Sequence, residues 1–262
     1  MPRFSLNEAS EEAARFFRRE AAIILPIAFA TFGIGMLLIA LMTPEPPANG
    51  QVEPGAWMLA LIPVGLVAIL GQLAISALVL RPGASVGEAL RAAFARMPRA
   101  LLIVLTIIAA AMIGTVAVTL VLGVIAAATG AGALSLTVLA VVLIVTLMIW
   151  FAARLLLVWP MMIDRDQGAV ATLRAAWRLS KGSTARLLAA LITYGLVYVV
   201  VTGAIQLGFG AFFLIVGKAL GAEGAARFLV AVVVAVAASA LQAMWAVFLT
   251  CLYRAAAPTS GS

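Results

Sequence analysis

The sequence contains no histidine, a single cysteine and few charged residues, and each shortage excludes a class of chemistry. Without histidine, the chain has no Ser-His nucleophile pair, no usual zinc site and no imidazole to act as acid or base near neutral pH. The single cysteine, Cys251, excludes both a disulfide within the chain and a thiolate cluster for a metal. Neither a cofactor nor a metal site is therefore expected.

Charged residues make up only 10% of the chain, whereas 65% of its residues are hydrophobic. A soluble globular domain has about 25% charged residues, so this chain has more apolar surface than a water-soluble fold uses. A helix that crosses a bilayer needs about 20 predominantly apolar residues. The apolar runs here are long and unbroken, which favours helices over the alternating strands of a membrane barrel. The composition therefore predicts an all-α fold, a polytopic membrane helical bundle.

Six apolar runs are long enough to cross a bilayer, so about six transmembrane helices are expected. They cover residues 21–42, 57–80, 100–127, 134–159, 187–216 and 225–252. Pro160 is expected to end the fourth run, because proline interrupts a helix. The first run is expected to be retained, since it is longer than the core of a signal peptide. A short disordered tail is expected at residues 254–262.

Basic residues are concentrated on one side of the predicted bundle. Residues 1–20, 81–99, 154–186 and the tail hold 15 of the 17 lysines and arginines. Because short cytoplasmic loops are enriched in these residues, both termini are expected to be cytoplasmic. The net charge of +7 is accordingly attributed to attraction to anionic lipid headgroups, and nucleic acid is not an expected partner.

Two of the basic segments begin with the same helix-start signal. Ser5 and Glu8 have the spacing of a capping box, and so do Ser85 and Glu88, 80 residues further along the chain. In a capping box, each side chain accepts a hydrogen bond from a free backbone N–H of the other residue. Both segments are therefore expected to form amphipathic interfacial helices.

The third basic segment resembles the second. Residues 173–177 (LRAAW) match residues 90–94 (LRAAF), and Val170, Leu173 and Trp177 share one helical face that basic side chains flank. The pattern favours a threefold repeat of an interfacial helix and two spans within one membrane domain. Its units would cover residues 5–80, 83–160 and 166–252. The alternative is that basic amphipathic linkers resemble one another by composition alone.

Arg154 is the cation that lies deepest within an apolar run. It precedes Pro160 by six residues, which corresponds to about 9 Å of helix. A guanidinium at that depth can extend to the interface as a plain anchor, bond helix carbonyls, or bind a lipid phosphate. Together with the cations of the third segment, it forms the set of candidate headgroup-binding residues: Arg154, Arg174, Arg178 and Lys181.

Four polar side chains within the runs are candidates for helix packing or for lining a path: Gln72, Gln206, Gln242 and Ser239. Ser239 also belongs to a ridge of small residues at four-residue spacing, which lets another helix approach closely. All ten carboxylates lie outside the runs. An intramembrane aspartyl protease and a carboxylate-dependent carrier are therefore not expected, and neither is any other enzyme.

A longer motif runs through residues 154–187: Arg154-Leu155, Pro160, Leu173, Trp177, Leu179, Lys181-Gly182 and Arg186-Leu187. It resembles the membrane domain found with some bacterial glycerophosphoryl diester phosphodiesterases and the related YciC-like membrane proteins, although Ala176 stands where that family has serine. The resemblance implies a multi-pass protein of the bacterial inner membrane, associated with lipids. In fused members of the family, the phosphodiesterase chemistry belongs to a separate soluble domain that needs histidines, which this chain lacks.

These features leave two functional hypotheses. The first is a non-catalytic, lipid-interacting membrane protein that scaffolds, senses or organises membrane components. The alternative is a transporter or flippase for a lipid or small amphiphile. In both, the expected partners are membrane lipids with anionic headgroups, together with a membrane protein or a second copy of the chain.

Overall fold

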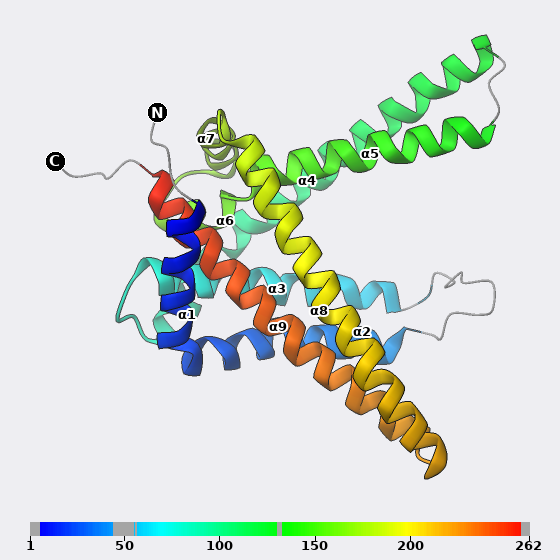
Figure 1. Ribbon diagram of the computed structural model, residues 1–262. Coiled ribbons are helices and arrows are strands. Elements are labelled where there is room, and N and C mark those ends of the chain that lie inside the picture. The colour runs from blue at the N-terminus through cyan, green and yellow to red at the C-terminus, as the bar shows by residue number, and fades with distance from the viewer. Residues whose placement is uncertain (1–5, 44–54, 56, 130–132, 258–262) are drawn as a thin grey trace. The chain divides into compact units, whose positions relative to one another are not determined.

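The computed structural model describes residues 6–43, 55, 57–129 and 133–257, and the regular structure in this part of the chain is helical. The expected all-α fold is confirmed. The elements (Figure 1) are α1 (Leu6–Ala28), the π-helical turn η1 (Phe29–Gly33), α2 (Ile34–Met42), α3 (Trp57–Leu80), α4 (Val86–Thr129), α5 (Ala133–Leu155), α6 (Val158–Asp164), α7 (Ala169–Ser180), α8 (Thr184–Ala219) and α9 (Glu223–Ala256).

Among the residues that the structure describes, six helical stretches are long and apolar enough to cross a membrane. They are Leu6–Met42, Trp57–Leu80, Val86–Ala128, Leu136–Asp164, Thr184–Ala219 and Glu223–Ala256. Each overlaps one of the six predicted runs. By length and composition, the expected bundle of about six spans is therefore confirmed.

The first two predicted interfacial helices are continuous with the spans that follow them. α1 extends from the polar residues near the N-terminus into the first apolar run, and α4 extends from Val86 to Thr129 with Pro98 inside it. Only α7 is a separate helix. It is divided from α8 by a turn in which Gly182 has a φ of 89°, a conformation that favours glycine.

The capping box at the start of α4 forms as predicted. The backbone N–H of Ser85 donates to Glu88 Oε2 at 2.8 Å, and the N–H of Glu88 donates to Ser85 Oγ at 3.3 Å. These bonds satisfy donors that the first turn of a helix leaves free. The corresponding Ser5 lies outside the described residues.

The prediction that Pro160 ends the fourth helix is wrong. α5 ends at Leu155, and Pro160 lies in the first turn of α6, where a backbone N–H is not needed for the helix. The hydroxyl of Ser180 donates to the carbonyl of Arg154 at 2.7 Å, which satisfies one carbonyl at the end of α5. Arg154 therefore lies in the last turn of α5, and the apolar stretch continues beyond it through α6 to Asp164.

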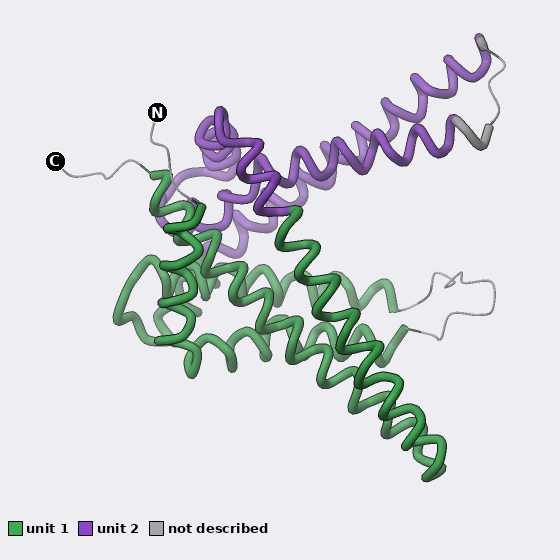
Figure 2. Tube along the Cα trace, viewed as in Figure 1, with its two compact units in different colours: residues 1–95, 192–262 green, residues 96–191 purple. Residues whose placement is uncertain are grey.

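The chain divides into two compact units (Figure 2). Unit 1 contains residues 1–95 and 192–262, and unit 2 contains residues 96–191. Unit 1 thus combines elements from both ends of the chain, whereas the predicted repeats are consecutive in sequence. The repeat itself remains a prediction.

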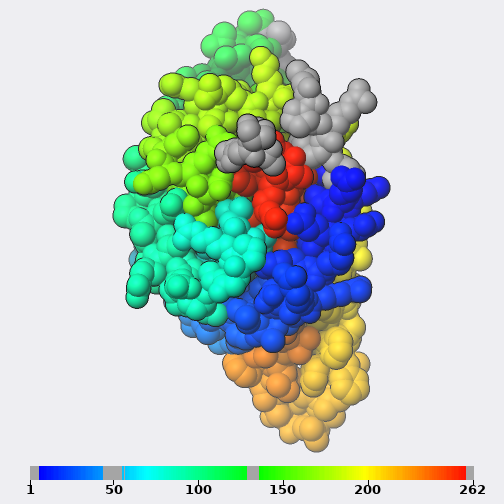
Figure 3. Space-filling model, turned by 90° about the vertical axis from the view of Figure 1, so that its left-hand side faces the viewer, coloured from blue at the N-terminus to red at the C-terminus, as the bar shows by residue number. Residues whose placement is uncertain are grey.

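Unit 1 has its core around α9, which packs against α1, η1, α2 and α3. Figure 3 shows the C-terminal end of α9 beside α1, and Arg254 Nη1 lies 3.2 Å from Glu12 Oε1 between these two helices. α1 and α2 run in clearly different directions (Figure 1). Pro26 and η1 lie between the straight parts of these helices, and prolines and π-helical turns are the usual causes of such kinks.

Small side chains bring the helices of unit 1 close together. Gly71 on α3 faces Thr31 of η1 so closely that a Cβ atom on residue 71 would overlap with the threonine. Ser239 and its neighbours at four-residue spacing, Ala235 and Ala243, are buried on α9. The small-residue ridge predicted on this helix therefore lies inside the packed unit, as close helix contacts in membranes require.

Candidate functional site

Arg154 packs against two neighbouring tryptophans in unit 2. Its guanidinium carbon lies 5.1 Å from the ring centroid of Trp150 on the same helix and 4.6 Å from that of Trp177 on α7. Nη1 also donates to the carbonyl oxygen of Trp177 at 3.3 Å. A guanidinium is attracted to the faces of aromatic rings. The contacts of Arg154 with Trp150 and Trp177, here called the tryptophan clamp, therefore join the end of α5 to α7. Bonding to a helix carbonyl, one of the roles that the sequence left open for Arg154, is thus present in the structure.

α7 carries an apolar stripe that basic side chains flank. Val170, Leu173 and Trp177, which the sequence places on one side of this helix, line the same cavity. Thr172 and Ala176 are buried, and the Thr172 hydroxyl donates to the carbonyl of Gly168 at 3.1 Å. The apolar stripe predicted from the spacing of these residues therefore lines an open cavity at the surface of unit 2.

Three cations of the candidate set lie on or just after α7. Arg174, Arg178 and Lys181 are all exposed, and none of them forms an ion pair within the part of the chain that the structure describes. Arg174 is also part of the cavity rim. These side chains are available to an anionic group at the membrane surface, whereas Arg154 is half-buried in its tryptophan clamp.

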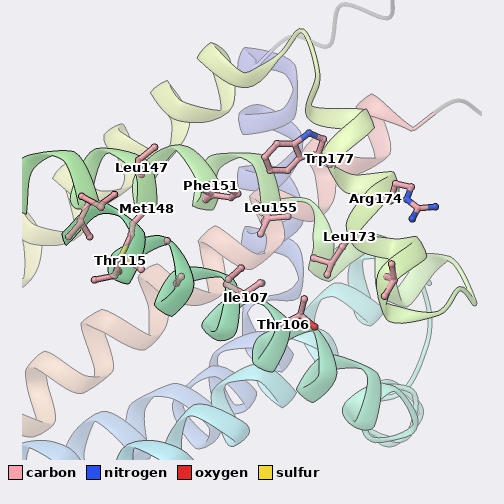
Figure 4. Close-up of a pocket in the computed structure, with 16 residues that line it drawn as sticks. Thr106, Ile107, Thr115, Leu147, Met148, Phe151, Leu155, Leu173, Arg174 and Trp177 are labelled. Atoms are coloured by element: carbon pink, nitrogen blue, oxygen red, sulfur yellow. The ribbon is translucent and has the colours of Figure 1, made fainter. Parts of the chain in front are cut away.

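The cavity lies between α4, α5 and α7 and has a volume of about 380 Å³. Its lining is almost entirely apolar, and its base on α4 is formed by small residues, including Ala110, Ala111 and Gly114. Figure 4 shows Phe151 and Leu155 facing the cavity, whereas the guanidinium of Arg174 points away from the apolar lining. The cavity is therefore apolar along its length and has a cationic side chain, Arg174, at its α7 end.

Two arginines at the start of unit 2 attach α4 to the segment that leads into α7. Arg96 donates to the carbonyl of Met162 in α6, and Arg99 forms an ion pair with Asp166. The hydrogen bond from Arg99 and its charge lower the pKa of the Asp166 carboxyl below its ordinary value of 3.8. These contacts position α7 beside the α4–α5 pair.

The polar candidates within the spans lie in unit 1, whereas the cations of α7 belong to unit 2. Gln242 accepts a hydrogen bond from the Tyr194 hydroxyl at 3.0 Å, and Ser239 donates to the carbonyl of Val236 at 2.8 Å. Gln72 lies on α3 with a buried side-chain nitrogen that has no hydrogen-bond partner among the described residues. Gln206 is exposed on α8, beside a groove that α2 and α9 complete.

Sequence reasoning did not find the α4 and α5 sides of the cavity. The available signal was the group of small residues at Ala110, Ala111 and Gly114, which recur at helical spacing. In an alanine-rich chain such spacing occurs often. No group of three or more potential metal-ligating His, Cys, Asp or Glu side chains occurs within the described ranges.

Comparison with known proteins adds no relatives to this description. No protein-family model matches the chain, and no curated protein or solved structure is significantly similar to it.

Proposed function

We propose that this chain is a non-catalytic integral membrane protein that binds anionic lipids at the membrane surface through α7. In this role it scaffolds, senses or organises membrane components. The observation that carries the proposal is the arrangement of α7, whose apolar face lines a cavity while Arg174, at its rim, points outward. An amphiphile with an apolar part and an anionic headgroup is complementary to this arrangement.

The location of the protein is part of the same proposal. The distribution of basic residues and the resemblance to the membrane domains of bacterial phosphodiesterases favour the bacterial inner membrane, with both termini cytoplasmic. In that orientation α7 meets the cytoplasmic leaflet, where the anionic lipid surface attracts basic side chains by about 1 kcal/mol each. Arg174, Arg178 and Lys181 are exposed and so are placed to use this attraction.

Charge reversal tests the proposal. The purified protein in neutral detergent is titrated with phosphatidylglycerol, and the bound lipid is counted by native mass spectrometry. The triple variant Arg174→Glu, Arg178→Glu, Lys181→Glu is expected to lower the apparent affinity at least about tenfold, because three attractive charges become repulsive. Zwitterionic phosphatidylcholine is expected to bind both proteins weakly and equally.

A matched control reverses three exposed cations of unit 1, with the substitutions Arg15→Glu, Arg18→Glu and Arg91→Glu. Net charge changes by the same amount in both triple variants, so a general electrostatic effect lowers phosphatidylglycerol binding equally in the two. Equal losses, or no loss in the α7 variant, would contradict the proposed site. A loss confined to the α7 variant supports it.

A transporter or flippase is the alternative function. Polar headgroups or solutes that cross a membrane need polar groups along their path, whereas the cavity of unit 2 is almost entirely apolar. The cavity is better suited to hold an acyl chain than to pass a headgroup. Movement of a fluorescent phospholipid between the leaflets of proteoliposomes, faster than in protein-free vesicles, would support the alternative instead.

A further inference from the structure

The cavity of unit 2 has the dimensions of a single lipid chain. Along α4 it extends from Thr106 to Val118, which corresponds to about 18 Å of helix. Half of the bilayer hydrocarbon core is about 15 Å thick. A volume of about 380 Å³ is at the small end of the range for ligand pockets, roughly 300–1,000 Å³. These dimensions suit one chain that reaches from an interface to the bilayer midplane.

The cavity is open because α4 presents small residues to α5. Apart from the adjacent residues and the backbone of its own helix, no atom of the described residues lies within 4 Å of the position that a Cβ on Gly114 would occupy. The described part of the chain therefore leaves the space in front of this residue empty. Across the cavity, α5 contributes larger apolar side chains, including Met148 and Phe151. An apolar space of this kind between two spans takes up hydrocarbon in a bilayer.

The α7 end of the cavity carries the side chains that would meet a lipid headgroup. Arg174 is the only charged residue among the described residues that line it, and its guanidinium points away from the apolar interior. Trp177 lies at the same end, fixed by its contact with Arg154. Aromatic and basic residues together are typical of the headgroup level of a membrane. A chain in the cavity would therefore have its anionic group at α7.

We infer that the cavity is a binding site for one acyl chain of an anionic phospholipid, whose phosphate lies beside Arg174. This inference rests on the proposed function and adds to it a defined position for the bound lipid. The second chain of the lipid remains in the surrounding bilayer, because the cavity has room for one chain only. One tightly held lipid per protein is therefore expected.

Photolabelling of the wild-type protein tests the position of the chain. The protein is reconstituted in nanodiscs containing a phosphatidylglycerol that carries a diazirine near the middle of one chain, and the labelled peptides are identified by mass spectrometry. Label is expected on the cavity-lining parts of α4 and α5, around Gly114 and Met148. Label spread evenly over the exposed apolar faces of both units would overturn the inference.

A variant that fills the cavity provides the second part of the photolabelling experiment. Gly114→Leu places a side chain in the cavity and is expected to lower labelling of the lining peptides at least tenfold. Gly123→Leu is the matched control, because residue 123 lies on the same helix, outside the cavity, and a Cβ added there would also have no atom within 4 Å. Equal labelling of the two variants would contradict the inference. Circular dichroism and gel filtration verify that both are folded.

The α7 charge-reversal variant separates this inference from the proposed function. If label stays in the cavity but charge reversal leaves the preference for phosphatidylglycerol over phosphatidylcholine unchanged, headgroup recognition by α7 is wrong and the chain site stands. If charge reversal removes the preference while the label lies outside the cavity, the chain site is wrong and headgroup recognition stands.

Discussion

The two units use small residues in opposite ways. In unit 1, Gly71 allows α3 to approach Thr31 until the two residues are in close contact. In unit 2, Gly114 faces open space, and a cavity lies between its helix and α5. A glycine within a membrane helix therefore does not by itself indicate close packing. The side chains on the facing helix determine whether the space is closed or left for lipid.

Alanine at the two glycines tests this difference directly and has the largest expected effect. Gly71→Ala is expected to lower the free energy of unfolding by about 1–3 kcal/mol, because the new Cβ overlaps with the β-branched Thr31. Gly114→Ala is expected to leave it unchanged or raise it by up to about 1 kcal/mol, since alanine has the higher helix propensity. Unfolding in mixed micelles titrated with SDS measures both values.

A compensating change in the facing residue provides the control. Thr31→Gly removes the atoms that the new Cβ would meet, so combining it with Gly71→Ala is expected to recover part of the lost stability. Similar losses for Gly71→Ala and Gly114→Ala would mean that the two units are packed alike, contrary to the comparison.

Substitutions of Arg154 test how much the contacts between α5 and α7 stabilise unit 2, which has an open cavity between its helices. Arg154→Ala removes contacts with two tryptophan rings and a hydrogen bond to Trp177, and is expected to destabilise the protein by about 1 kcal/mol. Arg154→Lys is expected to restore little of this, because lysine lacks the planar guanidinium. Unfolding is monitored by tryptophan fluorescence. Full recovery by lysine would indicate a plain interfacial anchor instead.

A buried hydroxyl pair tests polar packing in unit 1. Thr250 Oγ1 donates to Ser76 Oγ at 3.2 Å, and both residues are buried. Hydrogen bonds between membrane helices contribute about 0.6 kcal/mol on average. A double-mutant cycle of Ser76→Ala and Thr250→Val is expected to give a coupling energy of about that size. Strictly additive losses would show that this bond adds nothing to the packing of unit 1.

The smallest expected effect is the pH dependence of the ion pair that attaches α7 in unit 2. Arg99 lowers the pKa of Asp166 below 3.8, so the folded state favours the charged carboxylate. Its contribution to stability is present above the unfolded pKa and is lost as the pH falls through the lower folded value. The difference in Tm between wild type and Asp166→Asn is therefore expected to be constant above about pH 5 and to shrink below about pH 4. A difference independent of pH would contradict a role for the carboxylate charge.

Much of the fold can be predicted from local sequence. The six apolar runs, the capping box at Ser85 and Glu88, and the shared face of Val170, Leu173 and Trp177 each follow from residues within about 20 positions of one another. Bilayer length, helix periodicity and free backbone groups at helix ends act over that range. These features therefore did not depend on knowing which helices meet.

Other features were decided only by tertiary contacts. The last turn of α5 accepts a hydrogen bond from a hydroxyl 26 residues away, at Ser180, and Arg154 packs against Trp177 of α7. The cavity depends on which faces of α4 and α5 turn toward each other. In a bilayer, the face of a helix that meets lipid and the face that meets protein are both apolar, so hydropathy alone does not distinguish them. Local sequence is thus enough to predict six helices that can cross a membrane, whereas the packing of α4 against α5 creates the cavity for which we propose a lipid chain.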